Sequence, residues 1–124
     1  MKTVLVTGGS GFFGDVLKTR LLADGFCCVN VDLRADTARH PALVSIQGDI
    51  RDAALLERLF AEHRFAAVFH CGAILAHDVH HRDALWSSNV DGTVIVARLA
   101  QLHGVPKIVY ISSNCLWAAP DARR

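Results

Sequence analysis

The chain has 124 residues, the length of one domain, and 52% of them are hydrophobic, which is enough to form a core. Its formal net charge is +1 with no block of basic residues, so the sequence does not indicate a nucleic-acid or membrane surface. The stretch before Gly8 is too short for a signal peptide or a membrane span, and we expect a cytoplasmic protein.

A buried strand followed by a helix is predicted at the start of the chain. The strand is the apolar run from Thr3 to Thr7. Helical spacing of apolar residues begins soon afterwards, and Gly25 stands where helix ends favour a left-handed residue. The apolar positions of this helical pattern are Val16, Leu17, Leu21 and Leu22.

The turn between this strand and helix is rich in glycine and predicts a site for a dinucleotide phosphate. Glycine accepts backbone angles and close approaches that a Cβ would forbid. The free N–H groups of the next helix would face the pyrophosphate of a bound cofactor, while Gly14 would let helix and strand pack closely. We expect Phe12 and Phe13 to contact the cofactor through their backbone N–H groups and to pack their rings within the protein. The spacing fits either Gly8, Gly11 and Gly14 or the pattern G-x-G-x-x-G of Gly9, Gly11 and Gly14.

A second apolar stretch, Cys27 to Val31, ends at Asp32. A carboxylate about 20 residues after such a turn is placed to hydrogen-bond the adenine ribose. This favours NAD, because Asp32 would repel the 2'-phosphate of NADP, although Arg34 leaves room for NADP. The alternative is that Asp32 merely ends a strand and that the glycines form an ordinary loop.

The rest of the chain continues the alternation of strand and helix. One helical pattern follows Asp52, with Leu55, Leu56, Leu59 and Phe60, and a long one runs from about Arg82 to His103 and ends at Gly104. Strict alternation predicts an α/β fold: a doubly wound parallel sheet of strand order 3-2-1-4-5 with helices on both faces. Ligands of such sheets bind outside the carboxyl ends of the strands. The further strands are Leu43 to Gln47, Ala66 to His70 and Lys107 to Ile111.

The long helix carries apolar residues along more than one line. A helix with such wide apolar coverage needs two partners. One is the sheet, and the other is either a neighbouring helix of this chain or a second subunit, which would make a homodimer. The two lines are Trp86, Val90, Val94 and Ala97, and then Ile95, Leu99 and Leu102.

The cysteines and histidines do not indicate a disulfide scaffold or a metal site. The cysteines lack a C-x-x-C pair and lie in or beside apolar stretches, as reduced buried cysteines do. His77 and His81 could bind a metal if their loop were helical, but a solvated loop needs none, and we expect no metal. His70 ends an apolar strand and is expected to be a core histidine with hydrogen-bond partners. The four cysteines are Cys27, Cys28, Cys71 and Cys115.

Five segments in this order resemble the extended short-chain dehydrogenase/reductase family, specifically its NAD-dependent nucleotide-sugar epimerases and dehydratases. The resemblance spans nearly the whole chain and implies a Rossmann-type NAD(P)-binding fold. The segments are Thr7 to Gly14, Val31-Asp32, Gly48 to Asp52, Val68 to Ala73, and Asn89 to Thr93 followed by Val109 to Ser113.

The resemblance implies a role for each matching residue. Gly8, Gly11 and Gly14 would hold the pyrophosphate, Asp32 the adenine ribose, and Asp49 with Ile50 the adenine edge. Cys71, Gly72 and Ala73 would pass beside the cofactor, Asn89 would stabilise that loop or touch the cofactor, and Ser112 would be a backbone or cofactor contact. Ser113 matches the active-site serine or threonine, whose hydroxyl donates a hydrogen bond to a substrate oxygen as charge develops there. From the residues alone, a capping hydroxyl at a strand end is the favoured interpretation of Ser113.

The chain departs from the family pattern around and after Ser113. Members carry a Tyr-x-x-x-Lys pair in which the tyrosine is the acid/base, whereas this chain has one tyrosine, Tyr110, with no lysine four residues after it. Trp117 and Ala118 also stand where many relatives have Tyr and Gly. We therefore expect residues 1–124 to be an NAD-binding Rossmann domain that is incomplete at its C-terminus and lacks the substrate region.

The sequence thus predicts the NAD-binding part of an epimerase or dehydratase that acts on nucleotide sugars by transient hydride transfer. This part is expected to be inactive alone. Two alternatives stay open at this point: a non-catalytic NAD-binding module or subunit, and an NAD(P)-dependent carbonyl reductase of the same fold.

Overall fold

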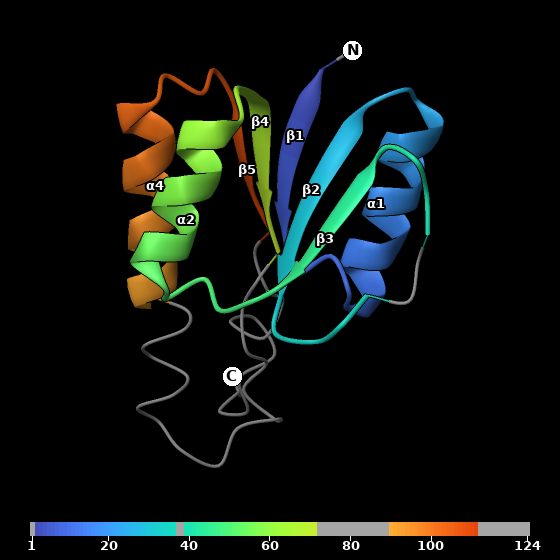
Figure 1. Cartoon of the computed structure of the whole chain (residues 1–124), viewed down its shortest axis with the longest axis horizontal. Helices are drawn as coiled ribbons and strands as arrows, with labels where there is room; N and C mark the ends of the chain where they lie inside the picture. Colours follow the sequence, from blue (N-terminus) through green and yellow to red (C-terminus); the bar gives the residue numbers. More distant parts are fainter. Residues whose placement is uncertain (1, 37–38, 72–89, 112–124) are drawn as a thin grey trace, which may run out of the picture.

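The computed structural model of the chain describes residues 2–36, 39–71 and 90–111. They form one parallel sheet in the order β3-β2-β1-β4-β5, which confirms the predicted topology (Figure 1). The strands are β1 (Thr3–Thr7), β2 (Cys27–Asp32), β3 (Leu43–Gln47), β4 (Phe65–His70) and β5 (Ile108–Tyr110).

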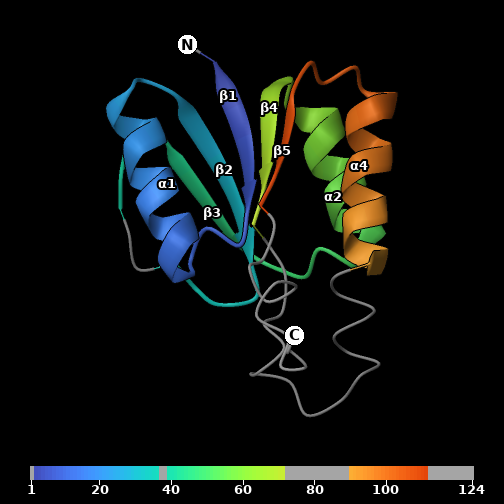
Figure 2. The same ribbon diagram turned by 180° about the vertical axis from the view of Figure 1, so that it is seen from behind.

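Helices cover both faces of this sheet. Helix α1 (Phe12–Ala23) lies on one face, and α2 (Ala53–Glu62) and α4 (Gly92–Leu102) lie side by side on the other, as the two opposite views show (Figure 1, Figure 2). The strands all end at the lower edge in Figure 1, where the glycine turn joins β1 to α1. The carboxyl edge of the sheet and the start of α1 therefore come together. No helix among the described residues is long and apolar enough to cross a bilayer.

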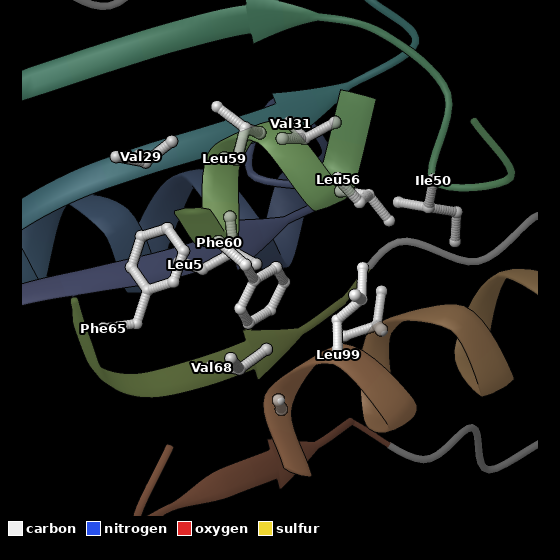
Figure 3. Close-up of a cluster of buried hydrophobic side chains, with 12 residues drawn as sticks. Leu5, Val29, Val31, Ile50, Leu56, Leu59, Phe60, Phe65, Val68 and Leu99 are labelled. Carbon is white, nitrogen blue, oxygen red and sulfur yellow. The ribbon is translucent and has the colours of Figure 1, made fainter. Parts of the chain in front are cut away.

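Two hydrophobic cores follow from the alternation of side chains along the strands. Successive strand residues point to opposite faces, so Leu5, Val29 and Val68 meet α2 and α4, whereas Val4 and Val6 face α1. Figure 3 shows the first core, in which the rings of Phe60 and Phe65 meet edge-on with centroids 5.2 Å apart. Burial on both faces explains why the central strands are almost continuous apolar runs.

Helix α2 follows its sequence pattern closely. The carboxylate of Asp52 accepts a hydrogen bond from the backbone N–H of Leu55 at 3.1 Å and so caps the first turn. Leu56, Leu59 and Phe60 are buried as their spacing predicts. The predicted helix after Asp52 is confirmed.

Helix α1 buries the predicted Leu21 and packs Leu17 and Leu22 against the core on its side of the sheet, but Val16 lies outside the buried face. Its buried residues are Gly14, Lys18 and Leu21, which share one face at spacings of four and three, whereas Val16 is 56% exposed. Val16 lies about half a turn away from that face, so the expectation that it belongs to the buried stripe is wrong. A lysine takes the buried position.

Helix α4 begins at Gly92 within the described residues, so the predicted start near Arg82 lies outside them. Leu99 is buried and Ile95 packs against the first core, as predicted. Leu102, in contrast, is 75% exposed, and Val94 is exposed as well. The line of Ile95, Leu99 and Leu102 therefore packs inward except at its last residue, and Val94 of the other line faces outward. Gly25 and Gly104, predicted to end helices, both have positive φ.

Candidate cofactor-binding site

The glycine turn is fixed to the carboxyl ends of the central strands. The N–H of Gly8 donates to the carbonyl of Val31 at 2.8 Å, and the carbonyl of Gly8 accepts from the N–H of Gly11 at 3.2 Å. Gly8 has a φ of 74°, a left-handed conformation that favours glycine. The turn therefore curls over the end of β2 before α1 begins.

Two glycines of the turn have different reasons to lack a side chain. A Cβ on Gly14 would overlap the carbonyl oxygen of Gly8 and lie 2.7 Å from the Cα of Gly9, so the fold itself needs glycine there. A Cβ on Gly11 would meet Arg34 Nη2 at 3.4 Å and the Gly8 oxygen at 3.5 Å, which are ordinary contacts. The fold thus leaves room at Gly11 that a close ligand could use.

The first turn of α1 offers backbone N–H groups to a ligand. The N–H groups of Phe12, Phe13 and Gly14 have no acceptor among the described residues, and the capping position is Gly11, which has no side chain to supply one. Free N–H groups and the positive end of the helix dipole together favour an anion. The beginning of α1 is therefore suited to a phosphate.

The rings of Phe12 and Phe13 do not pack within the described part of the protein. Phe12 is 91% exposed and Phe13 is half exposed, so the expectation that they are packing residues is not met there. Both lie off the face of α1 that carries Gly14 and Lys18 toward the sheet. Their backbone N–H groups, which were the expected contacts, stay available.

Asp32 stands directly against the glycine turn. Its Oδ2 accepts a hydrogen bond from the N–H of Ser10 at 2.9 Å, and its Oδ1 accepts one from the N–H of Arg34 at 2.9 Å. A carboxylate has about four lone-pair positions, so Asp32 can accept further hydrogen bonds from hydroxyl groups. The structure thus brings together the residues that were predicted to hold the pyrophosphate and the ribose.

Asp49 and Ile50 follow β3 at the same edge of the sheet. The Asp49 carboxylate accepts from Nε of Arg51 at 3.0 Å, and this hydrogen-bonded ion pair holds the pKa of Asp49 below its usual value. The side chain of Ile50 is buried in the first core, against Gly92, where a Cβ would lie 2.5 Å from Ile50 Cδ1 (Figure 3). The backbone of Ile50 is therefore the part of this residue that can reach a base.

His70 is buried at the end of β4, and its ring nitrogens both have partners. Nδ1 lies 2.7 Å from Thr7 Oγ1, Nε2 lies 2.9 Å from Thr93 Oγ1, and the ring stacks on Tyr110 with centroids 5.4 Å apart. Burial lowers the pKa of His70 to about 4, so the ring is neutral at pH 7. The prediction of a core histidine with hydrogen-bond partners is confirmed.

Cys71 continues from β4 toward the predicted cofactor path. Its N–H donates to the carbonyl of Thr7 at 2.9 Å, and burial raises the pKa of its thiol to about 11. The thiol is therefore protonated at neutral pH and is a poor nucleophile. Several predicted residues lie outside the described ones: Gly72, Ala73, His77, His81, Asn89, Ser112, Ser113, Trp117 and Ala118.

A buried polar network behind the glycine turn was missed by the sequence analysis. Lys18 is fully buried, and its Nζ donates to the carbonyl of Gly9 at 2.8 Å and to Oδ2 of Asp36 at 2.6 Å. The N–H of Gly9 donates to Oδ1 of Asn30, in β2, at 2.8 Å. One indication was present in the sequence, because Lys18 stands four residues after Gly14 and hence on the same helix face.

Asp36 joins this network to the edge of the sheet. Its side chain is only 3% exposed, and its Oδ2 accepts hydrogen bonds from Ser45 Oγ at 2.7 Å and from Asn30 Nδ2 at 3.3 Å. The loop after β2 is therefore tied to β3, to β2 and, through Lys18, to the glycine turn. Within residues 2–36, 39–71 and 90–111, no group of three or more histidine, cysteine, aspartate or glutamate side chains could hold a metal.

The sequence matches the NAD dependent epimerase/dehydratase family over residues 4–123. UDP-glucose 4-epimerase 4 of Oryza sativa subsp. japonica is 35% identical over 136 aligned residues, which cover 96% of this chain and 36% of the relative. The UDP-glucose 4-epimerase of Neisseria meningitidis serogroup C is 35% identical over 132, covering 97% and 39%. The crystal structure of UDP-glucose 4-epimerase from Bifidobacterium longum in complex with NAD+ and UDP superposes with a TM-score of 0.82 at 29% identity, covering 94% and 38%. The chain thus spans less than two fifths of the length of these relatives.

Proposed function

Because this chain belongs to the NAD dependent epimerase/dehydratase family, we propose that it forms the NAD-binding part of an enzyme that epimerises or dehydrates a nucleotide sugar. The relatives named UDP-glucose 4-epimerases support a UDP-sugar as the substrate class, and a relative crystallised with NAD+ supports the cofactor. The observation that carries the proposal is that the free N–H groups at the start of α1 and the carboxylate of Asp32 lie at the same glycine turn.

The residues at this turn fit a dinucleotide. The N–H groups of Phe12, Phe13 and Gly14 would donate to the pyrophosphate, which can pass close to Gly11 because no Cβ fills that space. Asp32 would accept hydrogen bonds from the hydroxyls of the adenine ribose and would repel a 2'-phosphate. The backbone of Asp49 and Ile50 would contact the adenine edge. These assignments form a continuous line along the carboxyl ends of β1, β2 and β3.

The remaining assignments concern the reacting end of the cofactor. When bound, NAD supplies the hydride acceptor and donor for the reaction at the sugar. Cys71, Gly72 and Ala73 would pass beside the cofactor, with Asn89 and Ser112 as further contacts. The protonated thiol of Cys71 would not compete with the reaction. Ser113 would donate a hydrogen bond to the sugar oxygen whose charge develops during hydride transfer.

Isothermal titration of the purified chain with NAD, NADP and UDP-glucose tests the proposal. We expect saturable binding of NAD and weaker binding of NADP, because Asp32 favours a free ribose 2'-hydroxyl. Binding of UDP-glucose is a separate result and does not bear on the cofactor. Absence of NAD binding by a folded chain would refute the function proposed here, and tighter binding of NADP would refute the role of Asp32.

We also propose a cytoplasmic protein that associates through α4. Among the described residues, Cys28 and Cys71 keep their thiols without a disulfide, which suits a reducing compartment. The outward-facing Leu102 of α4 supports a homodimer through this helix. Non-reducing gel analysis of the protein in its native host and sedimentation measurements test these two statements.

A further inference from the structure

Lys18 is a fully buried cation that the proposed cofactor contacts do not use. Its ammonium lies 2.6 Å from Asp36 Oδ2 and 3.4 Å from Asp15 Oδ1. Removing a lysine and an aspartate from water is costly, and a buried pair is often no more stabilising than apolar side chains of similar size. General stability is therefore a weak reason for this lysine, and its specific contacts are more informative.

The contact that Lys18 makes with the glycine turn fixes the orientation of one peptide group. Lys18 Nζ donates to the carbonyl oxygen of Gly9, behind the turn. The same planar, trans peptide carries the N–H of Ser10, which must point in the opposite direction. That N–H donates to Oδ2 of Asp32 at 2.9 Å. Lys18 and Asp32 thus hold the two ends of a single peptide group from opposite sides.

The preceding peptide is held in the same way, so the turn has two buried anchors. The N–H of Gly9 donates to Asn30 Oδ1. Asn30 Nδ2 in turn donates to Asp36, which also accepts from Lys18 and from Ser45. Asp36 lies in the loop that follows Asp32. Through Lys18 and Asn30 it holds this loop to Gly9, while Asp32 itself accepts from the Ser10 N–H.

We propose that Lys18 and Asp36 are positioning residues that set the cofactor preference of the site by holding the Gly9–Ser10 peptide. With Lys18 in place, the Ser10 N–H points toward Asp32 and holds its carboxylate where the ribose hydroxyls would bind. Without it, the peptide that follows Gly9 can turn over, because glycine accepts the backbone angles that this requires. Its carbonyl oxygen would then face both Asp32 and the pyrophosphate. The partial negative charge of this oxygen would repel both of these groups. This inference rests on the NAD-binding function proposed above.

The test is the ratio of the affinities for NAD and NADP in matched variants. We expect Lys18→Met to bind NAD about tenfold more weakly, a loss of about 1.4 kcal/mol. NADP, which gains little from Asp32, should lose less, so that the ratio falls. Asp36→Asn should shift the ratio in the same direction by a smaller factor. The control is Arg20→Met, which removes a cation from the same helix whose side chain is 78% exposed.

Each outcome separates this inference from the proposed function. If the unmodified chain does not bind NAD, the proposed function fails. If it binds NAD but a folded Lys18→Met variant keeps the same affinity ratio, only the positioning role is overturned. A fall in both affinities by the same factor would also overturn it. Should Lys18→Met fail to fold, Lys18→Met/Asp36→Leu removes both charges and must show the altered ratio. Failure of every variant to fold would mean that the network serves the fold alone.

Discussion

Thr7 and His70 stand opposite each other on β1 and β4, and their side chains lie 2.7 Å apart in the buried interior of the sheet. The other ring nitrogen of His70 reaches Thr93 of α4, so the ring joins two strands and a helix. In the neutral ring one nitrogen donates to a threonine hydroxyl and the other accepts from one. A second proton would place a positive charge in this buried position, where it loses its hydration.

Acid should therefore destabilise the protein through His70. The pKa of His70 is lowered from 6.5 to about 4 by burial, so between these values the unfolded chain binds a proton that the folded chain does not. Stability is highest above pH 6.5 and falls as the pH approaches 4, by up to about 3 kcal/mol. Urea unfolding from pH 7.5 to 4 measures this slope. The slope should be shallower in His70→Gln, and equal slopes in the two proteins would contradict the prediction.

Replacing Asp32 by alanine should weaken NAD binding and reduce the discrimination against NADP. The carboxylate accepts from the Ser10 N–H and is proposed to accept from the ribose, so both the turn and the cofactor lose a partner. Parallel titrations with NAD and NADP measure the effect. An Asp32→Ala variant that still prefers NAD by the original factor would remove Asp32 from the site.

Replacing Gly11 by alanine should affect the cofactor and spare the fold. Gly11 has φ −82° and ψ 176°, which alanine adopts readily, and its Cβ would make ordinary contacts only. We expect the affinity for NAD to fall more than about tenfold, or roughly 1.4 kcal/mol, with the unfolding curve nearly unchanged. Gly14→Ala is the contrasting variant, because its Cβ overlaps the Gly8 carbonyl and should lower stability directly. Unchanged NAD affinity in folded Gly11→Ala would show that the cofactor does not approach this glycine.

The chain should not turn over a nucleotide sugar by itself. Its single tyrosine, Tyr110, lies in β5 against His70 and has no lysine four residues after it, so the family's acid/base pair is missing from the sequence. General acid–base help is worth about 10² to 10⁴ in rate. The expected result is binding of NAD without conversion of added UDP-glucose to another UDP-sugar, which chromatography of the nucleotide sugars measures. Hydride transfer by the purified chain would reveal an acid/base group elsewhere.

Apolar residues on the outer side of α4 and β5 should cause self-association. Leu102 is 75% exposed, and Ile108 and Tyr110 of β5 are exposed as well. Sedimentation velocity should show a concentration-dependent increase in mass. Leu102→Glu should shift the protein toward the monomer, whereas Ala61→Glu, which adds the same charge on the exposed side of α2, should not. A monodisperse monomer at high concentration would contradict this prediction.

The sequence predicted the centre of the sheet well because β1, β2 and β4 are largely buried on both faces. β1 and β3 have the predicted bounds, β2 and β4 are one residue longer, and β5 is shorter at both ends. An apolar run bounded by glycine or a polar residue specifies such a strand without reference to its neighbours. Edge strand β5 has less apolar contact to define its ends.

The buried polar network was beyond the reach of pattern analysis. Lysine in a helical pattern usually lies on the exposed face. The neighbouring residues Leu17, Leu21 and Leu22 predict a buried stripe that does not include Lys18. Asp36 stands in a polar stretch typical of a loop. The partners are far apart in the chain, so their contacts depend on the packing of α1 against β2, which no local spacing records. The same limit applies to Ile50, whose burial depends on Gly92.

The position of Arg34 has a consequence for the speed of cofactor capture. Its Nη2 lies 3.4 Å from where a Cβ on Gly11 would stand, so a positive charge lies beside the proposed path of the pyrophosphate. At long range this charge offsets the negative field of Asp32, and at short range the guanidinium must pair with the pyrophosphate or give way to it. The association rate constant should consequently fall as ionic strength rises, while an Arg34→Gln variant should lose most of that salt dependence.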